Sequence, residues 1–232
     1  MSGQAIVLFS GGIDSTTALY WARRRFSKVT ALTVDYGQTH RLEVRQARRI
    51  ARSLKVPHLV VSLPLKPWVS SALLGDGRHI PPGLKTARDD QGVPYTYVPF
   101  RNGIFLALAA AAAESRGAWD LVTGFHRLDT PDYPDTSGEF VRRMAAAINS
   151  GSAASRRGKR FRIHAPLLRL DKKGIISLGL KLGADYSRSL SCYRGREMPC
   201  GRCPACEVRD AAFAALGRVD PLRERLAKRK KK

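Results

Sequence analysis

Four cysteines form the most distinctive chemical group in this sequence. They follow the pattern Cys192-x7-Cys200-x2-Cys203-x2-Cys206, and residues 1–191 contain none. A disulfide framework would spread its cysteines along the chain, so the clustering points to a metal. Four thiolates at this spacing suit tetrahedral Zn²⁺ in a closed structural site. An iron–sulfur cluster uses similar spacings and is an alternative, as are free or redox-active thiols.

The segment Ser-Gly-Gly-Ile-Asp-Ser-Thr-Thr at residues 10–17 is the second such group. It follows a short apolar run, so it sits between a buried strand and a helix. Glycines allow close backbone approach, and successive amides at a helix N-terminus cradle anions. Asp14 would repel a phosphate, which leaves capping, orientation or Mg²⁺ binding as its role. Neither the dinucleotide pattern G-x-G-x-x-G nor the Walker pattern is present. An ordinary glycine-rich turn is the alternative.

The elements that must position these groups alternate along the chain. Apolar runs predict strands at residues 4–9, 28–34, 56–63, 119–123 and 160–164. Helical periodicity predicts helices at residues 15–26, 41–54, 101–117, 138–149, 172–182 and 207–216. This alternation predicts an α/β fold with a doubly wound, mostly parallel sheet. Ligands bind beyond the carboxyl ends of such strands. We therefore expect residues 10–15, 35–40 and 124–135 to converge on one crevice.

Composition divides the chain into segments. The proline-rich stretch 64–100 reads as an active-site insertion, and the Gly/Ser/Arg-rich stretch 150–159 as a flexible linker. The predicted organisation is an α/β domain at residues 1–185 that contains the residue 10–17 segment, a zinc-binding segment at 186–221 and a basic tail at 222–232.

The overall composition is that of a globular protein. The 232 residues are 44% hydrophobic, and 41 basic against 19 acidic residues give a net charge of +22. This excludes a wholly disordered chain, a collagen-like repeat and a disulfide-rich miniprotein. No apolar run reaches the roughly 18 residues that a membrane span needs. With no signal peptide evident, we expect a cytoplasmic protein. The charge by itself is only weak support for nucleic-acid binding.

Several motifs together resemble one family. The chain resembles the 7-cyano-7-deazaguanine synthase family in five places. They are the residue 10–17 segment, Asp35-Tyr36-Gly37-Gln38, Val98-Pro99 with Arg101-Asn102, Tyr133-Pro134-Asp135 with Glu139-Phe140, and Ser191-Cys192-Tyr193-Arg194-Gly195 before Cys200-Gly201-Arg202-Cys203-Pro204-Ala205-Cys206. That family belongs to the N-type ATP pyrophosphatase, or PP-loop, superfamily. The order of the motifs holds from residue 5 to about residue 221.

The resemblance implies a Rossmann-like fold of the adenine nucleotide hydrolase type. It implies a carbon–nitrogen ligase that converts 7-carboxy-7-deazaguanine and ammonia into 7-cyano-7-deazaguanine, through adenylated carboxylate and amide intermediates. The product would enter queuosine and archaeosine biosynthesis. The implied cofactors are ATP with Mg²⁺ and one structural Zn²⁺ on the four cysteines. The implied assembly is a homodimer, with no membrane partner and no obligatory nucleic acid.

The resemblance also implies roles for individual residues. The expected catalytic residues are Asp14, Arg101 and Lys172. The expected ATP-binding residues are Phe9, Ser10, Gly11, Gly12, Ile13, Asp14, Ser15, Thr16 and Thr17. The expected substrate-binding residues are Arg101, Asn102, Asp129 and Asp135. Alternatives stay open, because Arg101 and Lys172 also fit solvated helix starts, and the two aspartates also fit turn caps.

The sequence departs from the family pattern at Phe100, His126, Thr136, Ser137 and Leu190. Because several of these positions belong to the expected substrate pocket, they affect the prediction of substrate identity more than the prediction of ATP chemistry. One alternative is a PP-loop enzyme that acts on RNA or on a related carboxylate, stopping at the amide. Against an RNA-modifying enzyme, no cysteine lies outside the cluster and no separate RNA-binding domain is evident. A zinc-containing nucleic-acid-binding module is the other alternative.

Overall fold

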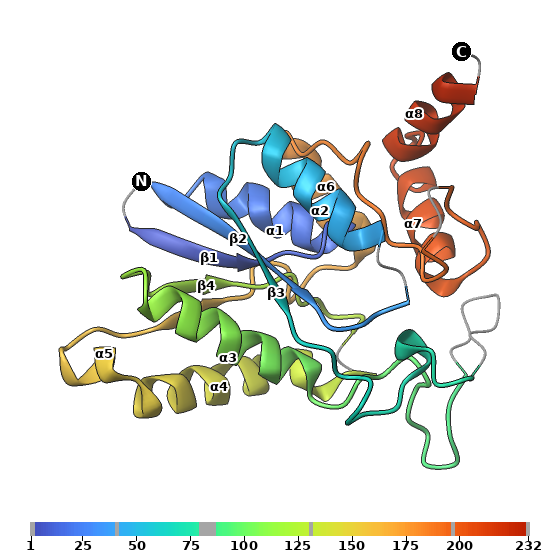
Figure 1. The fold of residues 1–232 in the computed structure, drawn as a ribbon. Helices are drawn as coiled ribbons and strands as arrows, with labels where there is room; N and C mark the ends of the chain where they lie inside the picture. Colours follow the sequence, from blue (N-terminus) through green and yellow to red (C-terminus); the bar gives the residue numbers. More distant parts are fainter. Residues whose placement is uncertain (1–2, 40–41, 79–86, 130–131, 196–197, 231–232) are drawn as a thin grey trace.

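Five strands form one parallel sheet at the centre of the computed structural model, which describes residues 3–39, 42–78, 87–129, 132–195 and 198–230 (Figure 1). The strands are β1 (Gln4–Leu8), β2 (Lys28–Asp35), β3 (His58–Ser62), β4 (Asp120–Val122) and β5 (Arg162–His164). Their order in the sheet is β3-β2-β1-β4-β5, and all the pairings are parallel. The expected doubly wound sheet is thus confirmed.

Helices cover both faces of the sheet. One layer holds α1 (Ile13–Arg23), α2 (Leu42–Ser53) and α6 (Lys172–Lys181), and the other holds α3 (Arg101–Glu114) and α4 (Gly138–Gly151) (Figure 1). β1 serves both cores, because its side chains alternate: Ala5 and Val7 join the core under α1, and Ile6 joins the core under α3. Its continuous apolar sequence follows from burial on both faces.

Three segments differ from their sequence-based description. Residues 150–159, expected to be a flexible linker, carry the end of α4 and the short helix α5 (Ala153–Arg156), with Ala154 buried. Helix α7 spans Pro204–Ala214 and so begins earlier than expected. Residues 222–230, expected to be a basic tail, belong to helix α8 (Pro221–Lys230). The buried Leu222 and Leu226 explain this, because they pack into one cluster with the cysteines.

The remaining elements are short. The insertion at 64–100, where it is described, contains the 3₁₀ helix η1 (Ala72–Leu74), and a second 3₁₀ helix, η2 (Pro134–Thr136), precedes α4. None of the described helices combines the length and hydropathy needed to cross a bilayer.

The topology places a crevice between β1 and β4. The chain moves from β1 outward to β2 and β3, then returns to the other side of β1 to form β4. The loops after β1 and β4 therefore leave the sheet in opposite directions, and the gap between them is where such sheets bind ligands.

Candidate functional site

A cavity of about 480 Å³ lies at this switch point. Each of the three segments expected to converge, residues 10–15, 35–40 and 124–135, contributes some of its described residues to the wall of this cavity. This volume falls in the range of small-molecule sites. The sequence-based expectation of one shared crevice is confirmed.

The loop after β1 ends in a helix N-terminus that has no side-chain cap. Gly12 is the N-cap residue of α1 and has no side chain with which to cap the amides of the first turn. Gly11 has φ +85°, and a Cβ there would lie 3.0 Å from the backbone nitrogen of Ala47. On the other side, a Cβ on Gly124 would lie 3.1 Å from the nitrogen of Ser15. Glycines thus let α2 and the loop after β4 close around an uncapped, electropositive helix end.

The Ser15 hydroxyl organises this loop. Its oxygen accepts hydrogen bonds from the backbone N–H groups of Ser10, at 3.2 Å, and Gly11, at 3.1 Å. The Ser10 hydroxyl lies 3.1 Å from that of Ser15 and accepts from the N–H of Gly12 at 3.3 Å. The backbone amides of Ser10, Gly11 and Gly12 thus converge on these two hydroxyl oxygens, which fix the conformation of the loop beside the helix N-terminus.

Two of the expected ATP-binding residues have side chains that point into the core. The Thr17 hydroxyl donates to the carbonyl of Ile13 and lies 2.6 Å from the Tyr186 hydroxyl. Thr16 is fully buried, and neither threonine lines the cavity. Phe9, Ser10, Gly12, Ile13, Asp14 and Ser15 do line it, whereas Gly11 does not, because it packs against Ala47 of α2. The helical rotation of α1 explains the division, because only its first turn faces the crevice.

Four polar side chains form one cluster inside the cavity. Lys172 contacts Asp14, and a histidine lies next to both of them and to a second aspartate. The Nζ atom of Lys172 donates to Oδ1 of Asp14 at 2.6 Å and lies 3.0 Å from Nε2 of His126. The same Nε2 is 3.3 Å from Oδ2 of Asp129 and 3.7 Å from Oδ2 of Asp14. His126 is 4% exposed, and its Nδ1 has no hydrogen-bond partner among the described residues.

The two carboxyl groups of this cluster are perturbed in opposite directions. Burial raises the pKa of Asp14, but the Lys172 ammonium and the hydrogen bond with His126 outweigh it and hold that pKa well below its usual range. Burial raises the pKa of Asp129, and the nearby Asp14 carboxylate adds to the rise while His126 opposes it. Titratable groups pushed apart in this way are typical of functional sites.

Arg101 lines another part of the cavity. Its Nη1 atom donates to the Tyr36 hydroxyl at 3.2 Å, and its guanidinium carbon lies 5.5 Å from the centre of the Tyr36 ring. Burial lowers the pKa of Arg101, but the Tyr36 hydroxyl and nearby acidic groups raise it above its ordinary value. A fixed positive charge therefore faces the cavity from the first turn of α3.

Asn102 and Asp135 bind each other. The backbone N–H of Asn102 donates to Oδ2 of Asp135 at 2.8 Å, and its side-chain amide donates to Oδ1 at 3.1 Å. Asp135 is 4% exposed and does not line the cavity, whereas Asn102 does. Asp135 thus fixes the first turn of α3, next to Arg101, from the loop after β4.

The family departures have local explanations. Phe100 has φ 52°, a left-handed conformation that glycine adopts easily. The Thr136 hydroxyl donates to the carbonyl of Tyr133 at 2.7 Å, and Ser137 caps α4 by accepting from the N–H of Phe140. Of these positions, Thr136 and His126 line the cavity.

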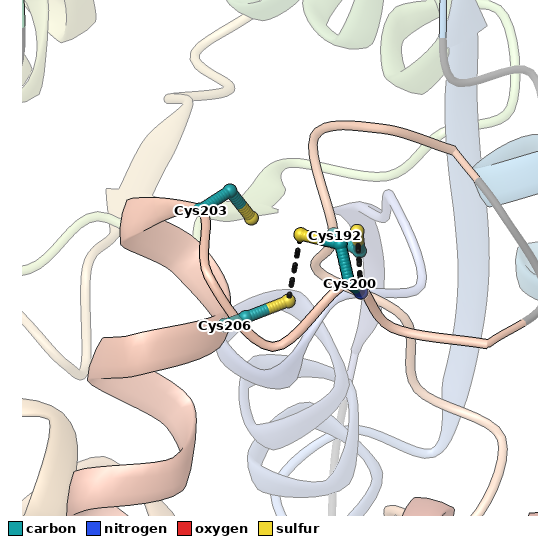
Figure 2. Close-up of side chains that lie close together, drawn as sticks. All are labelled: Cys192, Cys200, Cys203 and Cys206. Atoms are coloured by element: carbon teal, nitrogen blue, oxygen red, sulfur yellow. Dashed lines mark hydrogen bonds between the residues drawn. The ribbon is translucent and has the colours of Figure 1, made fainter. Parts of the chain in front are cut away.

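The four cysteines come together beside the cavity. Their sulfur atoms lie within 4.8 Å of one another, and all but Cys200 are buried. Figure 2 shows the four side chains gathered around one point, with Cys206 on α7. Four sulfurs bound to zinc at about 2.3 Å would be separated by roughly 3.8 Å, close to the 4.0 Å between the sulfurs of Cys200 and Cys206. The geometry fits one tetrahedral metal ion.

The cysteine segment is joined directly to the loop after β1. The N–H of Leu190 donates to the carbonyl of Gly11 at 3.1 Å. The buried Arg209 of α7 pairs with Asp220 at 2.6 Å and also donates to the carbonyl of Ser189 at 2.9 Å. A metal that holds α7 in place would therefore also shape the cavity, since α7 forms part of its wall.

Some cavity residues were absent from the set of expected site residues. They include Tyr36, His126, Tyr133 and Tyr193. The sequence did indicate their segments, because these residues follow β2, follow β4 or lie beside Cys192, and those segments lead to the crevice. Which side chains face inward depends on loop conformations that have no periodicity.

Comparison with known proteins gives a consistent result. The family model described as queuosine biosynthesis protein QueC matches residues 4–217. A relative from Anaeromyxobacter sp. (strain Fw109-5), named 7-cyano-7-deazaguanine synthase, is 44% identical and covers 94% of each chain. Another of that name, from Cupriavidus taiwanensis, is 41% identical over 98% of this chain and 100% of its own. A solved NMN synthetase from Francisella tularensis aligns over 94% of this chain and 78% of that chain, with TM-score 0.49 and 16% identity.

Proposed function

The chain belongs to the queuosine biosynthesis protein QueC family, and from this premise we propose how its cavity performs the reaction of a 7-cyano-7-deazaguanine synthase. Such an enzyme is an ATP-dependent ligase of the queuosine pathway. The observation that carries the proposal is the contact between Lys172 and Asp14 at an uncapped helix N-terminus, in the same cavity as Arg101.

The reaction needs two activations. Attack of the substrate carboxylate on the α-phosphorus of ATP releases pyrophosphate and gives an acyl-adenylate. Ammonia then displaces AMP, which forms the amide and releases a proton. A second ATP adenylates the amide oxygen and releases pyrophosphate, and loss of AMP together with the two amide protons leaves the nitrile. Each AMP thus carries away one oxygen atom of the original carboxylate.

We assign the phosphates to the loop after β1. Amides of the uncapped first turn of α1 supply hydrogen-bond donors, the Ser10 and Ser15 hydroxyls fix the loop beside them, and Lys172 supplies a positive charge. Both activations build negative charge on the departing pyrophosphate, and fixed dipoles and cations stabilise it. Mg²⁺ bound to ATP would screen the phosphate charges further. Asp14 holds the Lys172 ammonium in place, Gly12 leaves room for the nucleotide, and Gly11 allows α2 to pack against the loop.

We assign the acid to the side of the cavity that Arg101 faces. A guanidinium suits a planar carboxylate, so Arg101 would orient the reacting group. Asp129 is a carboxylate acceptor for the N–H groups of the deazaguanine ring. Asn102 and Asp135 act on this part of the site indirectly, since they fix the first turn of α3. The tyrosines at 36, 133 and 193 border the same space.

For the cysteine site we propose one structural Zn²⁺, which would hold the segment after residue 190 against the phosphate loop. Four thiolates leave no open ligand position, so this ion would take no part in the chemistry. We also propose a cytoplasmic enzyme, because reduced thiols and ATP are both available there. A homodimer with no obligatory nucleic acid follows from the family resemblance alone, and the oligomeric state can be checked by light scattering.

The fate of the carboxylate oxygens tests this mechanism. With substrate labelled in both carboxyl oxygens by ¹⁸O, we expect each AMP to contain one labelled oxygen, with two AMP formed per nitrile. Unlabelled AMP, or ADP as the nucleotide product, would contradict adenylation. One labelled AMP per amide, without nitrile, would instead identify an enzyme that stops at the amide.

A further inference from the structure

An arginine surface lies outside the cavity, on α2, α8 and the segment between α6 and α7. On α2, Arg45, Arg48, Arg49 and Arg52 are all exposed. Their spacing of three and four residues places them in one stripe along the helix. The opposite side of α2 packs on the sheet through Ala47, Ile50 and Ala51.

Helix α8 adds charges beside this stripe. Leu42, at the start of α2, packs against the apolar cluster that contains Leu222 and Leu226 of α8. Arg225 interacts electrostatically with Arg49, Arg188 and Arg229. We call the seven residues Arg45, Arg48, Arg49, Arg52, Arg188, Arg225 and Arg229 the arginine surface.

These positive charges are poorly balanced by the protein. Within the described part of the chain, none of the ion pairs includes a member of the arginine surface. Burial and the neighbouring arginines lower the pKa of Arg225. Among the main electrostatic neighbours of Arg225, only Asp185 raises this pKa. The Nε atom of Arg225 is buried and has no hydrogen-bond partner among the described residues. By contrast, Arg143 on the other face of the sheet pairs with Glu139.

We propose that the arginine surface docks the phosphate backbone of a double-stranded nucleic acid. Guanidinium groups bind phosphates in a paired geometry. The four arginines on α2 span about 10 Å from Arg45 to Arg52, which is enough to contact successive phosphates. No member of the surface lines the cavity. This interaction is therefore additional to the proposed synthase reaction and does not depend on it.

Other occupants fit less well. A second copy of this chain would bring like charges together. A membrane surface favours basic helices that also expose large apolar side chains. The exposed large apolar residues of the described chain lie outside α2 and α8: Trp68, Phe100, Leu128, Met198 and Val219. Because no exposed aromatic ring lies on the arginine surface, it also offers single strands no stacking platform.

Binding of a short labelled RNA duplex, measured by fluorescence anisotropy, tests the proposal with two matched variants. The first is Arg45→Gln, Arg49→Gln and Arg229→Gln, and the control is Arg142→Gln, Arg156→Gln and Arg160→Gln. All six residues are exposed, and each variant loses three charges, which takes the net charge from +22 to +19. Thermal unfolding confirms that both variants fold.

We expect the wild-type chain to bind the duplex with a Kd near the micromolar range at physiological salt, weakening as salt rises. The first variant should lose affinity about ten-fold or more and reduce the salt slope by about 2 to 3. The control should change affinity less than about two-fold. Equal weakening in both variants would overturn the proposal, because only net charge would then matter. It would also be overturned by no binding at physiological salt, or by tighter binding to the single strand or to phosphatidylserine vesicles. A DNA duplex of the same sequence shows whether helix form matters, and a backbone docking site should bind both.

Discussion

Lys172 and Asp14 stand 158 positions apart in the chain, yet Nζ of the first lies 2.6 Å from Oδ1 of the second. The contact joins the start of α6 to the first turn of α1, directly at the phosphate loop. It also accounts for the low pKa of Asp14 despite its burial. A lysine held in this way is a fixed cation at the point where the proposed reaction develops negative charge.

Replacing Lys172 by methionine should therefore affect catalysis more than folding. Loss of one preorganised charge is expected to lower kcat for nitrile formation by about 100- to 1000-fold. Lys173 is the matched control, because it is the next residue of α6 and is exposed. Steady-state rates and melting temperatures of Lys172→Met and Lys173→Met are the measurements. Similar rates for the two folded variants would mean that Lys172 is not part of the machinery.

The phosphate loop can be tested at Gly11. An alanine there must adopt φ +85° and also meet the backbone of Ala47 at 3.0 Å. Gly92 is a control with φ +78° and no atom within 4 Å of the added Cβ. Left-handed strain costs each variant about 1–2 kcal/mol. Only Gly11→Ala should raise the KM for ATP, by about ten-fold or more, if a cost of at least 1.4 kcal/mol falls on the loop. Equal KM values would show that the loop does not contact ATP.

The metal site predicts a link between zinc and the shape of the cavity. Purified protein should contain one zinc ion per chain by elemental mass spectrometry, and Cys206→Ser should lose it. Because the cysteines hold α7 and the segment joined to Gly11, metal loss should lower the melting temperature by at least about 5 °C. It should also weaken ATP binding in calorimetry. Iron in place of zinc would favour the cluster alternative, and full stability without metal would rule out a structural ion.

The ring of the left-handed residue Phe100 should determine whether an alanine at position 103 destabilises or stabilises the protein. A Cβ on Gly103 would lie 2.3 Å from the Phe100 ring, so Gly103→Ala should lower the free energy of unfolding by about 1–3 kcal/mol. In a Phe100→Gly background the ring is gone, and alanine should then be neutral or stabilise the helix by up to about 1 kcal/mol. Urea unfolding of the wild type, the two single variants and the double variant gives the double-mutant cycle. The same cost in both backgrounds would mean that something other than the ring restricts Gly103.

Asp120 lies at the end of β4 opposite the cavity. Its carboxyl group should make the free energy of unfolding depend on pH. Burial raises the pKa of Asp120, but hydrogen bonds from Arg162 and His164 outweigh it and leave that pKa below its ordinary value. The carboxylate therefore stabilises the fold fully above its unfolded pKa near 3.9 and loses this effect as pH falls through its folded pKa.

We accordingly expect Asp120→Asn to lower the free energy of unfolding at pH 7 by about 1–3 kcal/mol. The difference from wild type should shrink as the pH falls below about 4. Asp210→Asn, which breaks a pair with Arg223 that is about one-third exposed, should cost about 0–1 kcal/mol. Chemical denaturation across this pH range is the measurement. A difference that is constant with pH would assign the effect to packing.

The sequence alone was sufficient to predict the sheet and the crevice, because strand and helix periods differ and parallel strands end at one edge. The cysteine cluster was predictable because its members are close in sequence. The pairing of Asn102 with Asp135 was not, since it joins residues 33 positions apart whose spacing carries no signal. Helix α8 was hidden by its basic composition, and only the two buried leucines, four residues apart, indicated it. Thr16 and Thr17 were assigned to ATP from a motif, although helix rotation turns them into the core.

Product analysis is the measurement that tests the account most directly. The protein is incubated with 7-carboxy-7-deazaguanine, ATP, Mg²⁺ and ammonium, and the products are identified by mass spectrometry. The account predicts the nitrile 7-cyano-7-deazaguanine, formed by the wild-type protein and lost in Lys172→Met. Accumulation of the amide alone, or no conversion of the acid while ATP is hydrolysed only in the presence of RNA, would contradict it.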